Sequence, residues 1–562
     1  MAEQSVPRVR GLAFILVTVF MVIIARMAYV QLVIGEGLAE RGRDQRSVCL
    51  ATVPQRGAVY DRNMRMLAGS FHRHALVVFP ASVKARDAVA TMVATVTGYP
   101  WGKCVSRLDS PAALYIEAGA ASPLGGRVVA EVIGKGLGDP GVLAVEQPAR
   151  YDPDAVAAHV IGYLDPSGTQ GAAGVEKLLD TYLREGAPGE VAVFADAKGA
   201  PLRGLGVRHL AGKPASASVK LAIDREIQCL VEEVMDDAAV ERGAVVVMDP
   251  RSGDVLAMAS RPAFRPDDIA AATHDVRSPL VNRAIMAYPP GSVFKVVVAA
   301  AAIESGAVSL RDTFHDPGYV DVGAARFRCY THEEGGHGDI TFMDAMAYSC
   351  NTAFIDAGLR TGAGRLVGLA ERLGLGATTG VALPGEQAGV LPDARFMSPQ
   401  DAANLAIGQG RLTVTPLQVA TVMSAVANGG LLLRPRLVME ILSNDPERAR
   451  SIEPAAPVRV LSEDTCRQLT FMLEAVTRWG TGTAAWVEEG GSCGKTGSAE
   501  TGKIDEAGSP VSHAWFAGFA PLSAPRLVIV VFVEEGTSGG RAAAPVFARI
   551  ARRALAIHPA SR

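Results

Sequence analysis

The chain begins with one long apolar stretch. Residues 11–34 are apolar at nearly every position, and Arg26 is the single charged residue among them. That length matches one membrane-spanning helix, from which Arg26 can extend its charge toward the interface. Arg8 and Arg10 precede the stretch, which predicts a cytoplasmic N-terminus and an extracytoplasmic remainder. A cleaved signal peptide is the alternative, but the sequence offers no convincing small-x-small cleavage site, which favours an uncleaved anchor.

The middle of the chain, residues 35–210, changes its pattern often and is rich in Gly, Ala and Pro. Residues 56–63 alternate like a strand that runs into an Asp-Arg-Asn turn, 158–163 have the pattern of a buried strand, and 174–180 begin a helical pattern. The polar residues show no arrangement of acid, base or ligand, so we predict a mixed α/β domain that serves as a scaffold or for interaction. Residues 211–218 are typical of a short linker.

The C-terminal part, from residue 219 onward, contains strand patterns at both ends and helical patterns between them. The first strand pattern is interrupted by a Pro/Gly turn, which predicts a β-hairpin. A mostly helical stretch then continues to about Trp479. The strand patterns cover residues 243–260, 494–500, 514–520 and 527–533, and an amphipathic helix covers 544–555. This order predicts one antiparallel sheet flanked by helices, an α+β domain.

These patterns predict an order of domains, which composition does not change. The order is a cytoplasmic tail (1–10), an anchor (11–34), a mixed α/β domain (35–210), a linker (211–218) and an α+β domain (219–562). With 562 residues, 49% of them hydrophobic and 20% charged, the chain has ample core for several domains. The net charge of −3 gives no reason to expect a nucleic acid partner. Seven scattered cysteines do not form a disulfide framework, although export permits a single bridge.

Candidate chemistry begins in the segment from Tyr288 to Lys295. Two prolines and a glycine precede Ser292, and an alanine-rich apolar run follows Lys295, as is typical of a helix start. Ser292 is expected on the first turn, where backbone N–H groups and the helix dipole favour negative charge. Lys295 lies three residues further on the same face and suits the base that a serine nucleophile needs. Ser-x-x-Lys alone is a weak signal, because most instances are a capping serine above a surface lysine.

Two further short motifs strengthen this interpretation. Ser349 and Asn351 follow a helical pattern at 342–348 and offer a hydroxyl to relay a proton and an amide to bind a peptide group. The third motif, on a predicted strand, is Lys495-Thr496-Gly497-Ser498. Its cation and hydroxyl suit a carboxylate, and its glycine lets a substrate backbone approach. Each motif is common by chance, but the ordered set Ser-x-x-Lys, Ser-x-Asn and Lys-Thr-Gly is specific.

On these motifs the chain resembles the class B penicillin-binding proteins, the single-spanning peptidoglycan transpeptidases of bacteria. The resemblance covers nearly the whole chain. Residues 56–63 are similar to the opening of that family's pedestal, or dimerisation, domain, and 407–410, 415–418 and 513–521 match its transpeptidase domain. The resemblance implies the penicillin-binding transpeptidase fold, in which helices flank a five-stranded antiparallel sheet. Ser498, where the family usually has threonine, does not put the chemistry in doubt.

The resemblance also implies a role for each motif residue. Ser292 is expected to attack the D-Ala–D-Ala bond of a stem peptide, with release of D-Ala and with Lys295 as base. That base needs a depressed pKa, which Lys495 could cause by repulsion. Ser349 is expected to relay a proton, and Asn351 to position the peptide amide. The terminal carboxylate is expected at Lys495, Thr496 and Ser498, beside Gly497, and the oxyanion at the backbone N–H groups of Ser292 and Ser498.

A set of metal-binding residue types lies between the first two motifs. Asp312, Cys329, His337 and Cys350 offer a carboxylate, an imidazole and two thiolates, which suit a structural zinc ion. Residues 329–338 also resemble a region where some elongation-type relatives carry a structural zinc. A disulfide between Cys329 and Cys350, or two unlinked buried thiols beside a solvated histidine, are the alternatives that the sequence leaves open. Catalysis itself is expected to require no cofactor.

Two other functions share some of these features. A β-lactamase or D,D-carboxypeptidase carries the same three motifs, but no further carboxylate motif is present to activate a water. The intact Ser292, Lys295, Ser349 and Lys495 speak against a catalytically idle membrane-anchored scaffold, and a β-lactam sensor would usually need more than one membrane helix. The expected partners are peptidoglycan stem peptides, β-lactams and a membrane glycosyltransferase, because no polymerising domain fits between the anchor and residue 210. The sequence does not distinguish division, elongation and sporulation.

Overall fold

The structure is a computed structural model, and it divides into two compact units that are interleaved along the chain. It describes residues 6–44, 47–51, 56–110, 114–117, 139, 141–152, 154–184, 186, 190–194, 207–210, 215, 217–504 and 510–557. Unit 1 comprises Met1–Pro54, His72–Ala149 and Ala187–Lys213, and unit 2 comprises Gln55–Phe71, Arg150–Gly186 and Pro214–Arg562. Two segments from the predicted scaffold region therefore pack with the C-terminal part of the chain.

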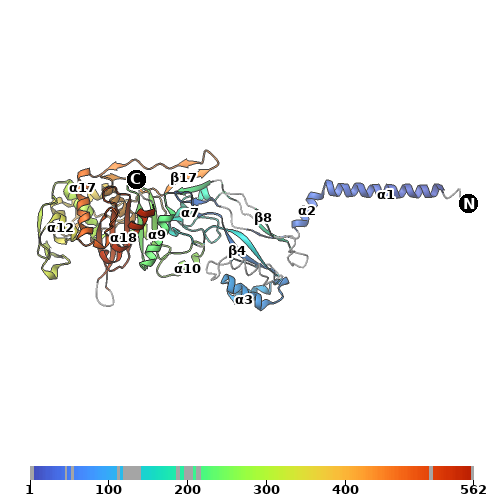
Figure 1. Ribbon diagram of the computed structural model, residues 1–562, viewed down its shortest axis with the longest axis horizontal. Coiled ribbons are helices and arrows are strands. Elements are labelled where there is room, and N and C mark those ends of the chain that lie inside the picture. Colours follow the sequence, from blue (N-terminus) through green and yellow to red (C-terminus); the bar gives the residue numbers. More distant parts are fainter. Residues whose placement is uncertain are drawn as a thin grey trace. The chain divides into compact units, whose positions relative to one another are not determined.

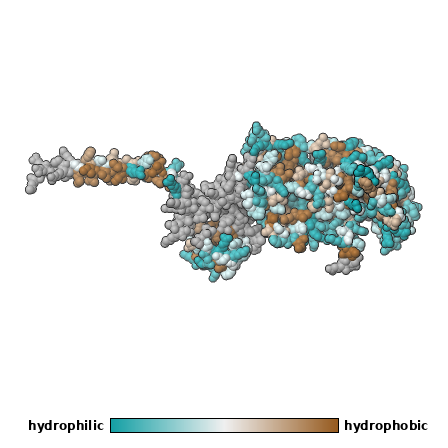
Figure 2. All heavy atoms as spheres, turned by 180° about the vertical axis from the view of Figure 1, so that it is seen from behind, coloured by the Kyte–Doolittle hydropathy of each residue, from teal (hydrophilic) through white to brown (hydrophobic). Residues whose placement is uncertain are grey.

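Unit 1 contains the long apolar helix. Helix α1 spans Val6–Leu32, and its 22-residue part Gly11–Leu32 is long and apolar enough to cross a membrane. Large apolar side chains such as Phe14 and Phe20 are exposed along it, and Figure 2 shows them as a nearly continuous apolar surface on the helix. An apolar helix that no part of the described protein covers is a candidate membrane anchor.

The rest of unit 1 consists of two small sheets and short helices. The sheets have the strand orders β1-β7-β8 and β5-β4-β6. Their strands are β1 (Ser47–Ala51), β7 (Glu190–Phe194), β8 (Val207–Leu210), β4 (Phe71–Val78), β5 (Leu114–Glu117) and β6 (Val142–Ala149), and the helices are α2 (Gly35–Asp44), α3 (Arg86–Thr97) and α4 (Trp101–Leu108). Val89 and Val93 of α3 and Leu108 of α4 share a core with Leu76 and Val78 of β4. This mixture of strands and helices agrees with the α/β scaffold that the sequence predicts.

Unit 2 is built on a five-stranded antiparallel sheet with the order β11-β10-β22-β21-β20. Its strands are β10 (Gly243–Met248), β11 (Val255–Arg261), β20 (Cys493–Ile504), β21 (Pro510–Ala520) and β22 (Leu527–Val533). The predicted hairpin and the three later strand patterns are thereby confirmed, and so is the α+β class. The last helical pattern is also confirmed, as α18 (Ala544–Ile557).

The sheet is buried on both faces, which explains why its central strands are continuously apolar. In β22, Val528, Val530 and Phe532 belong to one core, whereas Ile529 and Val531 belong to another. Alternate residues of a strand point to opposite faces, so a run without polar positions needs cover on both sides. Helices α9 (Arg225–Asp237) and α18 pack together over one face, as Figure 1 shows. Helices α11 (Lys295–Glu304) and α16 (Pro416–Ala427) contribute to the core on the other face.

Further elements of unit 2 surround this sheet. The helices are α6 (Ala158–Ile161), α7 (Gly174–Leu178), α8 (Asp180–Leu183), α10 (Ile269–Thr273), α12 (Phe342–Ala347), α13 (Asn351–Thr361), α14 (Ala363–Arg372), α15 (Pro399–Ala406) and α17 (Glu463–Arg478). Two antiparallel hairpin-like pairs join β12 (Thr313–Asp316) with β15 (Gly338–Thr341), and β13 (Tyr319–Val322) with β14 (Ala325–Arg328). A short pair joins β16 (Leu431–Leu432) with β19 (Val458–Arg459).

A second five-stranded sheet fixes the early segment of unit 2 to the later one. Its order is β18-β17-β9-β2-β3, in which β2 and β9 are parallel. The strands are β18 (Arg450–Ser451), β17 (Val438–Ser443), β9 (Ala217–Leu221), β2 (Val59–Tyr60) and β3 (Met66–Ala68). The predicted strand at 56–63 is therefore present as β2. Strand β9 begins inside the expected linker, of which residues 211–214 and 216 lie outside the described residues.

A buried ionic network joins the two early segments of unit 2. The guanidinium of Arg56 lies 3.0 Å from Glu176 and 2.8 Å from Asp180, and Arg150 lies 2.6 Å from Glu176. The side chain of Glu176 is fully buried and that of Arg56 is 1% exposed. Buried charges persist where they are paired and hydrogen-bonded, as Arg56 and Glu176 are.

The predicted strand at 158–163 is wrong, because residues 158–161 form the short helix α6. Ala157 and Gly162 flank it with positive φ angles of 58° and 83°, and all four helical residues are buried. A short run that is buried all round shows neither a helical nor a strand period, so its pattern could not distinguish the two. Gly162 is required here, since a Cβ atom would lie 1.9 Å from the carbonyl oxygen of Ala173.

Candidate active site

Ser292 lies on a single 3-10 turn, η4 (Gly291–Phe294), which leads directly into α11 at Lys295. Side chains three residues apart on such a turn are eclipsed, which directs Ser292 and Lys295 to one side. The turn is held from outside: the Gly291 N–H donates to the Gly408 carbonyl at 3.0 Å, and the Trp515 indole donates to the Pro289 carbonyl at 3.1 Å. The predicted helix start is confirmed, with Ser292 half-buried at its beginning.

Lys295 brings the first two motifs together. Its Nζ donates to the Ser349 carbonyl at 2.7 Å and to Oδ1 of Asn351 at 2.7 Å, and it lies 3.3 Å from Oγ of Ser349. Ser349 separates α12 from α13 and has a positive φ of 56°. A left-handed serine is uncommon and costs free energy, so the surrounding contacts must hold it in place. Because of this kink both polar groups of Ser349 face the amine.

The environment of Lys295 favours a neutral amine. The side chain is fully buried, and burial lowers its pKa to about 8, although the Cys350 and Cys329 sulfurs act in the opposite direction. The main cause of the lowered pKa of Lys295 is thus burial and not the predicted repulsion by Lys495. The charge of Lys295 instead contributes, after burial, to a strongly lowered pKa at Lys495. An amine with a pKa near neutrality is able to accept a proton from a neighbouring hydroxyl.

The third motif lies at the beginning of β20, with Lys495 fully buried. Nζ of Lys495 donates to the Thr496 carbonyl at 2.9 Å and lies 3.3 Å from Oγ1 of Thr496. A carboxylate placed beside this amine would raise its pKa again and would itself be stabilised. Ser498, three residues further along the same strand, is exposed.

Thr481 connects the third motif to the second and was not predicted from the sequence. Its Oγ1 lies 2.7 Å from Oγ1 of Thr496, and its N–H donates to the Ala347 carbonyl at 3.0 Å, at the end of α12. Gly480 allows this approach, because a Cβ there would lie 2.2 Å from the Ala347 oxygen. A Thr-Gly pair in a loop carries no distinctive chemistry, so only the fold reveals the bridge.

The first and third motifs also meet. A Cβ at Gly291 would lie 2.6 Å from the Ser498 carbonyl oxygen, and one at Gly497 would lie 3.1 Å from the Pro290 oxygen. Strand β20 therefore passes close beside the turn that carries Ser292. All eight predicted catalytic and substrate-binding positions fall in one neighbourhood of unit 2, on η4, α11, the α12–α13 junction and β20.

A group of four potential metal ligands lies beside the second motif. It consists of Asp316, Cys329, His337 and Cys350, whose ligand atoms all lie within 4.8 Å of one another. His337 Nδ1 is 2.6 Å from Oδ2 of Asp316 and 3.6 Å from Sγ of Cys329, and Sγ of Cys350 donates to Asp316 at 3.3 Å. Cys329 and Cys350 are both free thiols, so the structure does not contain the alternative disulfide between them.

The carboxylate in this group corrects the prediction of Asp312. Asp312 lies before β12 and accepts hydrogen bonds from the hydroxyl and N–H of Ser309 at 2.5 and 3.1 Å. Asp316 is buried at the end of β12 and pairs with Gly338 across to β15, which places it beside His337. Nothing in the local sequence distinguishes the two aspartates. The pairing of β12 with β15 decides which of them lies beside His337.

The four side chains are also electrostatically suited to a cation. Burial opposes ionisation of Asp316, but hydrogen bonds from His337 and Gly318 hold the pKa of its carboxyl below the usual range. A hydrogen bond from Cys350 lowers the pKa of the Cys329 thiol to about 5, and the same bond together with burial raises the pKa of Cys350. One thiolate and one carboxylate are thus available without an external base.

Comparison with known proteins places this geometry in a family. The family model "Penicillin binding protein transpeptidase domain" matches residues 243–552, and "Penicillin-binding Protein dimerisation domain" matches residues 51–214. The chain belongs to the class B penicillin-binding proteins. The fold, the three motifs and the preceding dimerisation domain all agree with that family.

Relatives and solved structures cover most of the chain. Stage V sporulation protein D of Bacillus subtilis is 34% identical over 558 residues, which are 96% of this chain and 84% of that protein. Peptidoglycan D,D-transpeptidase FtsI of Escherichia coli is 29% identical over 553 residues, 94% of this chain and 88% of that protein. The structure of penicillin-binding protein 3 of Mycobacterium tuberculosis has a TM-score of 0.64 at 26% identity and covers 90% of this chain and 97% of its own; it has also been solved with ampicillin.

Proposed function

We propose that this penicillin-binding protein is a serine-type peptidoglycan D,D-transpeptidase. The observation that carries the proposal is the buried amine of Lys295, with a pKa of about 8, which lies one turn after Ser292 and bonds to Ser349 and Asn351. A serine hydroxyl becomes a competent nucleophile where such a base takes its proton. The names of several relatives, such as peptidoglycan D,D-transpeptidase FtsI, support the reaction class.

Acylation follows from the arrangement of the first two motifs. Oγ of Ser292 attacks the carbonyl carbon of the D-Ala–D-Ala bond as neutral Lys295 accepts the hydroxyl proton. The C–N bond then breaks, and Ser349, in contact with the Lys295 amine, relays a proton to the leaving nitrogen. Free D-Ala departs and the donor peptide remains as an ester on Ser292. An amine of a neighbouring stem peptide attacks this ester, forms the cross-link and regenerates the serine.

Binding is assigned to the third motif and to Asn351. The Asn351 side chain positions the peptide amide, and the buried cation of Lys495 with Thr496 and Ser498 receives the terminal carboxylate. The backbone N–H groups of Ser292 and Ser498 receive the developing oxyanion, which commonly contributes about 3 kcal/mol per donor. Because Gly497 has no side chain, a substrate backbone can lie directly against β20 at this position.

The nucleophile is tested with a fluorescent penicillin, which mimics the dipeptide and acylates the same serine. Labelling of the full-length chain in detergent should be lost in Ser292→Ala and retained in Ser305→Ala, a matched serine at the end of the same helix. Covalent labelling of Ser292→Ala would refute the assignment. The lifetime of the adduct distinguishes the alternatives, since a β-lactamase releases it within seconds whereas a transpeptidase retains it.

The membrane arrangement and partners complete the proposal. Helix α1 anchors the chain with its N-terminus in the cytoplasm, since Arg8 and Arg10 flank that end. The catalytic domain then works outside the membrane on stem peptides of nascent glycan. A separate membrane glycosyltransferase supplies that glycan. The relatives carry sporulation and transpeptidase names alike, so the proposal concerns the reaction rather than a stage of the cell cycle.

Asp316, Cys329, His337 and Cys350 suit a structural zinc ion, which would be held by one carboxylate, one imidazole and two sulfurs. Such an ion would fix β12 and the 329–338 loop to Cys350, which lies between Ser349 and Asn351. Metal analysis of the purified chain is expected to find one zinc per molecule, lost in Asp316→Asn and in Cys329→Ser. Asp312→Asn is the matched control and should keep it. Equal zinc in all variants, or none in the wild type, would refute this site.

A further inference from the structure

The turn that carries Ser292 is held in place by contacts with other parts of unit 2. The N–H of Gly291 donates to the carbonyl of Gly408 at 3.0 Å, which is a contact between backbone groups. The indole N–H of Trp515 donates to the carbonyl of Pro289 at 3.1 Å. Because this second donor belongs to a side chain, a substitution can remove it without changing the backbone on either side.

Trp515 lies in the middle of β21, between the strand of the third motif and β22. It pairs with Gly497 of β20 on one side and with Phe532 of β22 on the other. Its side chain is fully buried, and its ring packs against that of Phe532 with 4.5 Å between the ring centroids. Residues directly opposite each other on neighbouring strands share a face of the sheet. The indole therefore lies on the same face as the missing side chain of Gly497, and packing holds it in one orientation.

Gly497 leaves room for the indole and for the Ser292 turn. A Cβ atom at Gly497 would lie 3.0 Å from Cγ1 of Val293 and 3.1 Å from the oxygen of Pro290, both in the turn segment. It would also lie 3.1 Å from Cβ of Trp515. Both carbon–carbon distances are below the optimal contact of about 3.5–4.0 Å. Strand β20, the turn and the indole are thus already in contact at this position.

The other face of β20 is also covered at this point. The short turn η8 (Gly539–Ala543) begins there: a Cβ atom at Gly539 would lie 2.7 Å from the oxygen of Gly497, and the Gly539 N–H lies 3.5 Å from Oγ of Ser498. Successive side chains of a strand point to opposite faces, so Ser498 and Gly539 meet on the face away from the Ser292 turn. Strand β20 therefore has no room to move away from the turn.

The separation between the turn and β20 matters for the proposed reaction. The backbone N–H groups assigned to the oxyanion belong to Ser292 on the turn and to Ser498 on β20. Both must lie about 2.7–3.1 Å from the oxyanion, and a misplacement of about 1 Å can lower a rate about 100-fold. The substrate carboxylate, in contrast, is assigned to Lys495, Thr496 and Ser498, which all belong to β20. A shift of the turn should therefore affect acylation more than binding.

We propose that Trp515 is a positioning residue for acylation. Its indole N–H holds the carbonyl of Pro289, and thereby the Ser292 turn, at the distance from β20 at which both backbone N–H groups reach the oxyanion. Trp515 contacts no reacting atom and acts only through the turn. This inference rests on the proposed function of Ser292 as the nucleophile.

The test measures acylation of the full-length chain in detergent by nitrocefin, a chromogenic cephalosporin. Stopped-flow kinetics separate the dissociation constant of the non-covalent complex from the acylation rate constant. Trp515→Phe removes the donor and part of the ring, whereas replacement of Trp515 by 3-benzothienylalanine removes the N–H and keeps the shape. Both should lower the rate constant about tenfold and change the dissociation constant less than about twofold, in line with the loss of one hydrogen bond. The rate should still level off near pH 8, because no contact of Lys295 is changed.

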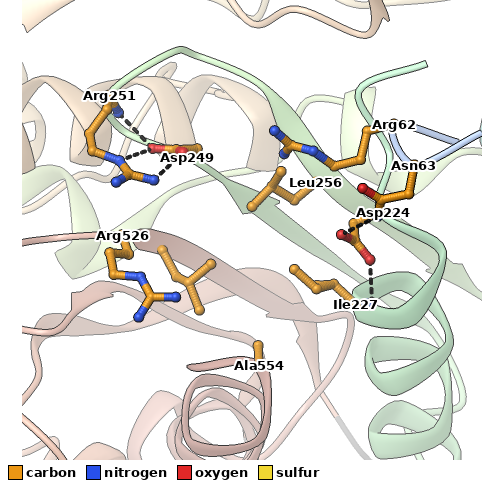
Figure 3. Close-up of a pocket in the computed structure, with 10 residues that line it drawn as sticks. Arg62, Asn63, Asp224, Ile227, Asp249, Arg251, Leu256, Arg526 and Ala554 are labelled. Carbon is orange, nitrogen blue, oxygen red and sulfur yellow. Dashed lines mark hydrogen bonds and ion pairs between the residues drawn. The ribbon is translucent and has the colours of Figure 1, made fainter. Parts of the chain in front are cut away.

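Leu256→Ala is the control for a general loss of packing. Leu256 is a buried residue of β11 in the core under α9 and α18. It lines a cavity of about 280 Å³, shown in Figure 3, that shares no residue with the three motifs or with the Ser292 turn. This variant should keep the wild-type acylation rate constant.

Hydrogen exchange gives a second readout, which requires no activity. The N–H of Gly291 is protected by its bond to Gly408. Its exchange, followed by mass spectrometry of a peptide that covers residues 288–294, should be at least about tenfold faster in both Trp515 variants than in the wild type and in Leu256→Ala.

The outcomes separate this proposal from the proposed function. A wild-type chain that nitrocefin does not acylate would refute the proposed function itself. The role of Trp515 is overturned, with acylation of the wild type intact, by a wild-type rate constant in the benzothienylalanine variant or by equal slowing in Leu256→Ala. A rise in the dissociation constant that accounts for the whole loss of efficiency would also overturn it.

Discussion

At the scale of single residues, the site depends on how one lysine is surrounded. The Lys295 amine is fully buried, and the hydrogen-bond acceptors around it are the neutral oxygens of Ser349 and Asn351. Neutral acceptors compensate a buried ammonium less than a carboxylate would, so burial dominates and the pKa falls to about 8. The residue is thereby suited to exchange protons near neutral pH.

This pKa predicts the pH dependence of acylation. Below pH 8 the amine is mostly protonated and cannot accept the serine proton, so the second-order rate of penicillin acylation should rise about tenfold per pH unit at low pH and level off above pH 8. Stopped-flow labelling between pH 5.5 and 9.5 measures this. Lys295→Gln should remove both the rate and its pH dependence. A rate that is flat between pH 6 and 8 would exclude Lys295 as the base.

Thr481 is predicted to be a positioning residue. It links Thr496 to the end of α12, so Thr481→Val should slow acylation by about tenfold, in line with the loss of one hydrogen bond worth about 1 kcal/mol and some displacement of β20. Thr481→Ser keeps the hydroxyl and should restore most of the rate with the pH profile unchanged. If the serine variant were as slow as the valine variant, packing of the methyl group rather than the hydrogen bond would be responsible.

At the scale of elements, the candidate active site is assembled from the ends of helices and the beginning of a strand. The turn η4 precedes α11, Ser349 lies where α12 gives way to α13, and Lys495 lies near the start of β20. At the end of a helix, backbone groups lack a hydrogen-bond partner within the helix and are free to bind other groups. Side chains in the adjoining loops are more exposed than those in the middle of an element. The buried network around Glu176 serves a different purpose, since it fixes an early segment of the chain to unit 2.

That network predicts a large effect of one substitution on stability. Glu176→Gln leaves the buried guanidinium of Arg150 without its compensating charge and leaves Arg56 with Asp180 alone, and the loss of stability is expected to be about 3 kcal/mol. The control is Asp356→Ala, which removes an exposed pair to Arg360 and should cost about 0.3–0.5 kcal/mol. Thermal inactivation, followed as residual penicillin labelling after heating, compares the two. Equal stability of both variants would show that the network contributes little.

At the scale of the whole molecule, the chain is divided differently in space and in sequence. Unit 2 takes the segments Gln55–Phe71 and Arg150–Gly186 from the region before the catalytic domain. The dimerisation-domain match at 51–214 therefore includes segments that pack against the catalytic core. Deleting part of residues 51–214 is expected to lower the stability of unit 2, whereas deleting α1 should leave that stability unchanged.

The anchor gives a prediction about topology. An alkaline phosphatase reporter, which is active only outside the cytoplasm, should be active when fused after residue 44 and inactive when fused before Arg8. Replacing Arg8 and Arg10 with glutamate should lower the activity of the first fusion, because the positive flank sets the orientation. Activity of the fusion before Arg8 would contradict the proposed orientation.

The sequence by itself determined the family and the central sheet, and it predicted the long apolar helix and the motif residues. These follow from local information: the length of an apolar run, the alternation along a strand, and short motifs in a fixed order. The sequence could not show that α6 is helical, since a short run buried on all sides has no visible period.

Only the tertiary structure decided which distant groups meet. It selected Asp316 over Asp312 through the pairing of β12 with β15, and it brought Thr481 to Thr496. It also assigned the lowered pKa of Lys295 to burial rather than to Lys495. Each of these depends on contacts between residues far apart in the chain, and such contacts leave no pattern in a single sequence.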